Sequence, residues 1–282
     1  MKPGTAATPA PALSGWAAPH YSRLVTVPPA PQPDAPAPQP AASGGPASGA
    51  AGPAEPAVAM IVAETTPAAT LFAPLAGRPV LEHSVAAFAA AGGIGGVLVV
   101  VPPGLASRVE QLIAAGDYPV PVRVIEDGGP RTAAIERALP PGDGPILIHD
   151  AAQPLVSVQV IENCLTALAT QPCVCAAIPA SDTMVAVTGD YISARTVRDR
   201  LRRRQSPHGF RLPVLRQVCE QARAADAGPA TGATATGDEC ALTLRLRPDV
   251  PVHLIPGSER SFSITGPDDL ALAEAVLAGP NR

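Results

Sequence analysis

The 282-residue sequence has very little lysine and few aromatic residues: Lys2 is the only lysine among 20 basic residues, and aromatic residues make up 3%. Its formal net charge is -4, so no excess of positive charge favours general binding to nucleic acid or to an anionic membrane. No apolar run approaches the roughly 20 residues of a membrane span, and the N-terminal stretch lacks the pattern of a secretory signal. These absences predict a cytoplasmic protein with neither a membrane nor a nucleic-acid partner.

Cysteine is also scarce, and the five cysteines are an odd number. In a long chain without a secretory signal, this predicts reduced thiols rather than a disulfide framework. One residue separates Cys173 from Cys175, whereas a redox motif needs two, and no second Cys/His pair along the sequence completes a zinc set. The cysteines fall within helix or strand patterns. The sequence therefore predicts buried thiols and no structural metal site.

Residues 1–56 form a separate compositional zone that holds 14 of the 36 prolines, together with much alanine, glycine and serine. This zone has few large apolar residues to offset the entropy of ordering, so it is predicted to be a disordered or partly polyproline II tail. A proline-rich interaction ligand is the alternative interpretation. The folded domain is expected over residues 57–282.

From residue 57 onward, short aliphatic runs alternate with longer amphipathic stretches. Continuous apolar runs are typical of strands buried on both faces of a parallel sheet, and they occur at 58–62, 97–101, 122–125, 146–149, 174–178 and 252–255. Helices are predicted at about 79–91, 104–115, 131–139, 157–170, 211–225, 238–245 and 267–278. This alternation predicts an α/β domain, with helices packed on both faces of a mostly parallel sheet.

One segment departs from the alternation. Residues 182–193 form two short alternating runs around Thr188-Gly189-Asp190, a pattern that predicts a β-hairpin. Six arginines follow between residues 195 and 204. They predict either a solvated arm or an anion-binding role for at least one of them. The whole arm is expected to span about residues 181–210.

Five segments resemble, in order and spacing, motifs of the 2-C-methyl-D-erythritol 4-phosphate cytidylyltransferase family: PLAGRPVLEHSVAAF (74–88), ILIHDAAQP (146–154), SDTMVAV (181–187), RQSPHGFR (204–211) and SITGPDDLALAEAVL (263–277). The resemblance implies a Rossmann-like nucleotidyltransferase fold and transfer of a cytidylyl group from CTP to a sugar-alcohol phosphate. It also implies Mg²⁺, pyrophosphate release, a role in non-mevalonate isoprenoid biosynthesis and a homodimer joined through the arm. The related ribitol-phosphate cytidylyltransferases share much of this pattern, so the substrate stays open.

The resemblance also carries over individual site residues. Asp150 matches an aspartate near the nucleotide and the metal, while Thr183, Arg198 and Ser206 match residues that hold the substrate phosphate. An aspartate that only caps a loop or helix, and an arginine that is only solvated, are the alternatives for Asp150 and Arg198.

Other positions depart from the family pattern. The family's glycine-rich nucleotide loop is replaced by residues 63–70, which are shorter and contain no Gly, Arg or Lys. Thr70 and Ser263 stand where the family has lysines, and Gln153 stands where it has an arginine. These losses predict weak or absent transfer. The alternatives are an inactive binding or regulatory partner, for instance of an active homologue, and a transferase of altered specificity that recruits cations from the arm arginines of another subunit.

Overall fold

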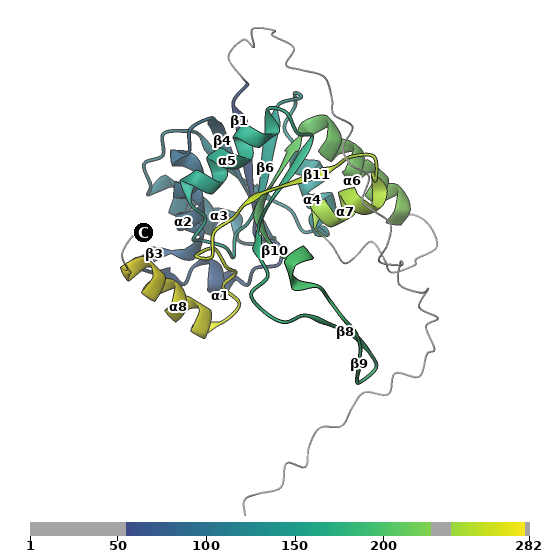
Figure 1. Cartoon of the computed structure of the whole chain (residues 1–282). Coiled ribbons are helices and arrows are strands. Elements are labelled where there is room, and N and C mark those ends of the chain that lie inside the picture. The colour runs from purple at the N-terminus through teal and green to yellow at the C-terminus, as the bar shows by residue number, and fades with distance from the viewer. Residues whose placement is uncertain (1–54, 227–237, 280–282) are drawn as a thin grey trace, which may run out of the picture. The chain divides into compact units, whose positions relative to one another are not determined.

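The computed structural model describes residues 55–226 and 238–279, and these residues fall within one unit, 52–282. Almost all of the predicted tail therefore lies outside the described residues. No helix in the described part of the chain is long and apolar enough to cross a membrane. Figure 1 shows a central sheet between two sets of helices, as the alternating pattern predicts.

The central sheet has seven strands in the order β11-β7-β10-β6-β1-β4-β5. Their bounds are β1 Ala57–Val62, β4 Ile94–Val101, β5 Val122–Glu126, β6 Pro145–Asp150, β7 Cys173–Pro179, β10 Arg202–Arg211 and β11 Val252–Pro256. The pairings are parallel except those of β10, which runs antiparallel to β6 and β7. All six predicted apolar strands are confirmed.

The helices divide between the two faces of the sheet, and each set closes its own core. One core contains buried residues of α2 Val80–Ala90, α3 Ala106–Ala114 and α5 Val158–Leu168. The other contains buried residues of α4 Arg131–Ala138, α6 Leu212–Asp226 and α7 Glu239–Leu246. A smaller cluster joins α8 Pro267–Ala278 to the short strand β2 Pro74–Leu75, which pairs with β3 Arg78–Pro79. All seven predicted helices are confirmed, and α1 Ala68–Leu71 adds a single turn after β1.

Strand β10 is the main element that the sequence did not predict, and it corrects the expected length of the arm. The hairpin consists of β8 Val185–Thr188 and β9 Tyr191–Arg195, followed by the short helix η1 Arg198–Arg200. Residues 205–210 are buried in the sheet between β6 and β7, so they do not belong to the arm as expected. Backbone pairing on both sides selects this strand, although its arginines and Pro207 disguise it in the sequence. Gly209 permits the close packing, since a Cβ there would lie 2.6 Å from Val174 Cγ2.

The sheet order places a crevice at the carboxyl ends of two central strands. After β1 the chain crosses to β4 on one side, and it later returns to β6 on the other side of β1. In open α/β sheets, ligands bind where the strand order reverses in this way. Val62 and Asp150 face each other at the ends of β1 and β6, so this crevice contains the predicted Asp150.

Candidate functional site

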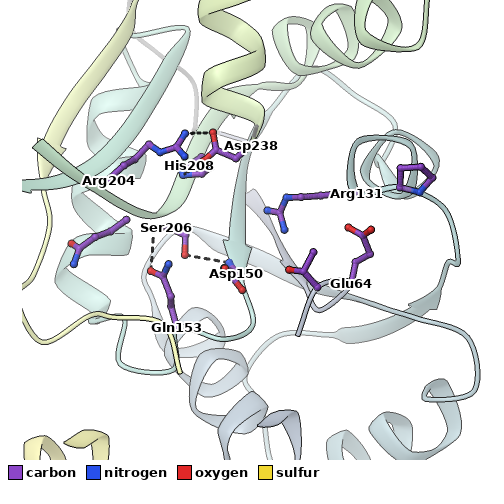
Figure 2. Close-up of a pocket in the computed structure, with 11 residues that line it drawn as sticks. Glu64, Arg131, Asp150, Gln153, Arg204, Ser206, His208 and Asp238 are labelled. Carbon is purple, nitrogen blue, oxygen red and sulfur yellow. Dashed lines mark hydrogen bonds and ion pairs between the residues drawn. The ribbon is translucent and has the colours of Figure 1, made fainter. Parts of the chain in front are cut away.

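A pocket of about 520 Å³ lies at the carboxyl ends of β1 and β6. Its lining combines loop residues after these strands with residues of β10 and the starts of α4 and α7: Glu64, Thr65, Pro130, Arg131, Asp150, Gln153, Arg204, Gln205, Ser206, His208 and Asp238. Figure 2 shows Asp150 between the Ser206–Gln153 pair on one side and Arg131 with Glu64 on the other. The fold thus brings three of the predicted positions, Asp150, Gln153 and Ser206, into one pocket.

Asp150 both shapes the loop after β6 and presents a carboxylate to the pocket. Its Oδ1 accepts a hydrogen bond from the Ala152 amide at 3.0 Å, which closes a tight turn. The side chain is half-buried and lines the pocket, where Glu64 supplies a second carboxylate. Oxygen donors of this kind fit Mg²⁺, which is commonly held by one or two carboxylates together with substrate phosphates.

Ser206 is committed to a buried network around His149. The Ser206 hydroxyl accepts from the Asp150 amide at 3.2 Å and lies 2.9 Å from Nδ1 of His149. Nε2 of His149 lies 3.0 Å from the Gln153 carbonyl oxygen, which can only accept, so Nε2 carries the proton and Ser206 donates to Nδ1. Burial lowers the pKa of His149 to about 3, and the ring is neutral. Ser206 therefore positions the Asp150 loop, and its only hydroxyl proton is already donated.

This network gives a first prediction. Replacing Ser206 by Ala removes both bonds and leaves His149 Nδ1 buried without a donor, so the free energy of unfolding should fall by about 1–3 kcal/mol. Urea unfolding followed by circular dichroism measures the loss. Ser181→Ala is the control, because Ser181 is exposed and its hydroxyl forms no hydrogen bond with the residues that the structure describes. An equal effect of the two substitutions would contradict the positioning role of Ser206.

Gln153 and Ser263 form a neutral pair at the edge of the pocket. Nε2 of Gln153 donates to Ser263 Oγ at 3.2 Å, and its Oε1 accepts from the Ser206 amide at 3.2 Å. Two positions that the resemblance predicts to be cationic are therefore neighbours in space. In this chain the two positions hold uncharged side chains, which form a hydrogen bond with each other.

The two arginines of the pocket are both held by carboxylates. Nε of Arg131 donates to Oε1 of Glu239 at 2.8 Å, and Glu239 is only 1% exposed. Arg204 is paired with Asp238, the residue that caps the N-terminus of α7 by accepting from the Ala241 amide. Each arginine is therefore matched by a neighbouring negative charge.

His208 connects these two ion pairs. Its Nδ1 lies 3.4 Å from Oε2 of Glu239, and its Nε2 lies 3.5 Å from Oδ2 of Asp238. Burial opposes the charged imidazolium, but hydrogen bonds to Cys175 and Glu239 and the charges of Asp238 and Glu239 outweigh it, raising the pKa of His208 to about 9. The positive charge of His208 is thus also held between carboxylates.

Glu64 adds a further anion on the opposite wall, in the turn after β1. Its Oε2 is buried and accepts no hydrogen bond from the described residues. Burial raises the pKa of the Glu64 carboxyl against the attraction of Arg131, so the loop supplies a poorly solvated carboxylate. Thr70, in α1, is half-buried and does not line the pocket.

The remaining predicted residues, Thr183 and Arg198, lie on the arm side of the sheet. Both are exposed, and Thr183 lines no part of the pocket. Arg198 lines a separate hollow of about 420 Å³, where its Nη1 lies 3.5 Å from the Ser181 carbonyl oxygen. Within this chain, the predicted phosphate ligands therefore divide between two places.

Several pocket residues escaped the sequence analysis. Arg204 was one of six clustered arginines, and His208 lay in a segment that was expected to belong to the arm. Asp238 stood at the start of a predicted helix, next to Glu239, the buried partner of Arg131, and an acidic residue at such a place is ordinarily a cap. The pairing of β10 with β6 and β7 places Arg204 and His208 beside the start of α7, where they contact Asp238 and Glu239.

Comparisons with known proteins agree with the sequence motifs. The family model described as 2-C-methyl-D-erythritol 4-phosphate cytidylyltransferase matches residues 63–279. The enzyme of that name from Thermobifida fusca (strain YX) is 40% identical over 213 residues, which cover 72% of this chain and 83% of that protein.

Two solved structures extend the likeness to the fold. A 2-C-methyl-D-erythritol 4-phosphate cytidylyltransferase from Thermus thermophilus aligns with a TM-score of 0.60 at 28% identity, covering 78% of this chain and 98% of that one. A 4-diphosphocytidyl-2C-methyl-D-erythritol synthase from Anaerococcus prevotii aligns with a TM-score of 0.70 at 21% identity, covering 80% and 99%. The chain and these proteins share one fold along nearly the whole length of the solved chains.

Proposed function

The chain belongs to the 2-C-methyl-D-erythritol 4-phosphate cytidylyltransferase family of isoprenoid biosynthesis, and we propose that it has lost most of the transferase activity and acts as a binding or regulatory partner. The observation that carries this proposal is the charge balance of the pocket. Arg131 and Arg204 are ion-paired with Glu239 and Asp238, and the lining adds the carboxylates of Glu64 and Asp150.

Cytidylyl transfer needs cations around the triphosphate. Negative charge develops on the phosphoryl oxygens and the pyrophosphate leaving group, and catalysis depends on groups already placed to stabilise it. Here the pair Gln153–Ser263 is neutral, and the nearest arginines must first leave buried or partly buried carboxylates. Asp150 and Glu64 are the carboxylates that would hold Mg²⁺, which would neutralise part of the phosphate charge.

Nucleotide binding tests this proposal directly. Calorimetric titration of the full chain with CTP and Mg²⁺ is expected to show no saturable binding below about 1 mM, because the charges of the pocket do not complement a triphosphate. A dissociation constant in the micromolar range would overturn the proposal.

A paired substitution shows whether missing cations are the cause. Gln153→Arg together with Ser263→Lys places two charges beside the pocket and should tighten CTP binding at least about tenfold, the effect of one charge-assisted hydrogen bond. The control is Gln159→Arg with Asn163→Lys, an exposed hydrogen-bonded neutral pair on α5 outside this pocket. If both double variants bound CTP more tightly by the same factor, the effect would come from added positive charge in general. That result would contradict the specific role of positions 153 and 263.

A surface on the arm favours contact with another chain of the same family. Six large hydrophobic side chains on and beside the hairpin are 43–80% exposed: Met184, Val185, Val187, Tyr191, Ile192 and Val197. Exposed apolar patches of this kind mark interaction sites. We propose that two copies of the chain form a homodimer through the arm. The alternative is a heteromer, in which the arm makes the same contact with an active homologue.

Light scattering of the full chain tests the arm. The chain is expected to be dimeric, and Tyr191→Ser with Ile192→Ser should raise the dimer dissociation constant at least about tenfold, since buried aromatic and aliphatic anchors dominate such interfaces. Leu254→Ser with Leu272→Ser is the control, because both leucines are more than half exposed but lie outside the arm. A monomeric chain that also fails to bind the Thermobifida fusca relative would contradict the proposal.

A further inference from the structure

The core beneath the pocket contains a group of metal-ligating side chains that the sequence did not connect. Cys175 of β7, His208 of β10 and Cys240 of α7 are buried, and one ligand atom of each lies within 4.8 Å of the others. Cross-strand pairing sets Cys175 directly opposite His208, and α7 packs into the same core. The spacing along the chain gave no zinc motif, because the three residues come from three separate elements.

A fourth ligand lies next to this group. Cys173 precedes Cys175 by two residues on β7, so both side chains point to the same face of the sheet. Cys173, Cys175 and Cys240 are all buried in the same core cluster. Together the four residues offer three sulfurs and one imidazole nitrogen, which is one of the ligand sets of structural zinc sites.

The surroundings suit a closed, structural site. Cys173, Cys175, Cys240 and His208 are 0%, 1%, 2% and 5% exposed. A carboxylate oxygen lies within 3.5 Å of each ring nitrogen of His208, so the ring can ligate through one nitrogen while the other donates to Asp238 or Glu239. A carboxylate that orients a ligating histidine in this way is typical of zinc proteins.

From this juxtaposition we infer that Cys173, Cys175, His208 and Cys240 form a tetrahedral binding site for Zn²⁺. Bonds of about 2.3 Å would place the sulfurs roughly 3.8 Å apart, and the ligand atoms of Cys175, His208 and Cys240 already lie within 4.8 Å of one another. The ion would fix α7 to β7 and β10. Because Asp238 and Glu239 begin α7, it would also fix the carboxylates that hold Arg204 and Arg131.

Cobalt is the probe for this site. The full chain, kept reduced and freed of metal, is titrated with Co²⁺ and then with Zn²⁺. One equivalent of Co²⁺ is expected to produce thiolate-to-cobalt charge-transfer absorption and intense tetrahedral d–d bands, and one equivalent of Zn²⁺ should remove them. Absence of thiolate absorption at one equivalent would overturn the inference.

Variants locate the ion. Cys240→Ser and His208→Gln should each weaken Co²⁺ binding at least about a hundredfold, since even changes outside the ligand shell typically cost 10–100-fold. Cys219→Ser is the matched control, because Cys219 is a fully buried thiol of the same core that is not in the group. The inferred site would also be overturned if Cys240→Ser left Co²⁺ binding unchanged, or if Cys219→Ser weakened it equally.

A measurement on the unaltered chain covers the case in which a variant does not fold. X-ray absorption at the zinc edge of the loaded protein should show sulfur scatterers at about 2.3 Å with one nitrogen at about 2.0 Å. Oxygen and nitrogen scatterers alone would place the ion elsewhere and refute the site.

Discussion

Pyrophosphate release from CTP, with methylerythritol phosphate and Mg²⁺, is expected to be at least about 10⁵-fold slower with this chain than with its Thermobifida fusca relative. Removing one preorganised donor to a developing oxyanion typically costs about 10²–10³ in rate. The family resemblance implies that a glycine-rich loop and three cations are replaced here by the turn containing Glu64 and by Thr70, Gln153 and Ser263. The individual losses are not additive, but together they are expected to lower the rate by about 10⁵-fold.

The comparison is made with both full chains at equal concentration, and Arg198→Ala of this chain is the control for a contaminating enzyme. If Arg198→Ala releases pyrophosphate as fast as the unaltered chain, the release does not depend on Arg198 and is attributed to a contaminating enzyme. Turnover within about a hundredfold of the relative, abolished in Arg198→Ala, would show that cations from another subunit complete the site. Release with ribitol phosphate but not with methylerythritol phosphate would instead establish altered specificity.

Replacing Glu239 by Gln is expected to lower the free energy of unfolding by about 3–5 kcal/mol. Glu239 is 1% exposed and balances both Arg131 and the imidazolium of His208, so its loss leaves buried positive charge without a partner. Urea unfolding of the full chain, with chelator present to exclude metal ions, measures the change.

Asp249→Asn is the matched control for Glu239→Gln. It also breaks an arginine–carboxylate pair, with Oδ2 of Asp249 2.7 Å from Nη2 of Arg247, but this carboxylate is 64% exposed. Exposed pairs contribute about 0–1 kcal/mol. Similar losses in the two variants would contradict the buried, structural role assigned to Glu239.

The pairing of Glu239 with Arg131 links stability to function. The carboxylate that stabilises the core beneath the pocket is also the one that neutralises a pocket arginine. For Arg131 to bind a phosphate, its guanidinium would have to leave Glu239. The buried carboxylate of Glu239 would then lose that partner, which is energetically costly. We therefore expect Glu239 both to stabilise the fold and to weaken the binding of a triphosphate in the pocket.

The sequence alone determined the fold class, the hairpin and every long helix and strand except β10, whereas the short elements α1, β2, β3 and η1 were not predicted. Aliphatic runs such as 97–101 are buried whatever their neighbours, and amphipathic stretches such as 267–278 carry their own start signals, so local patterns suffice for them. The motif around Asp150 also located the end of β6, because an acidic residue at the carboxyl end of a buried strand lies at the ligand-binding edge of the sheet.

Only the tertiary structure decided how charge and thiols are arranged. Strand β10 has too many arginines to be recognised as central, and it becomes a strand because β6 and β7 offer it unpaired backbone on both sides. Its placement pairs Arg204 with Asp238 and brings His208 to Glu239 and Cys175. Such pairings join residues far apart in sequence, and electrostatic and ligating interactions act through space, so no local pattern could have specified them.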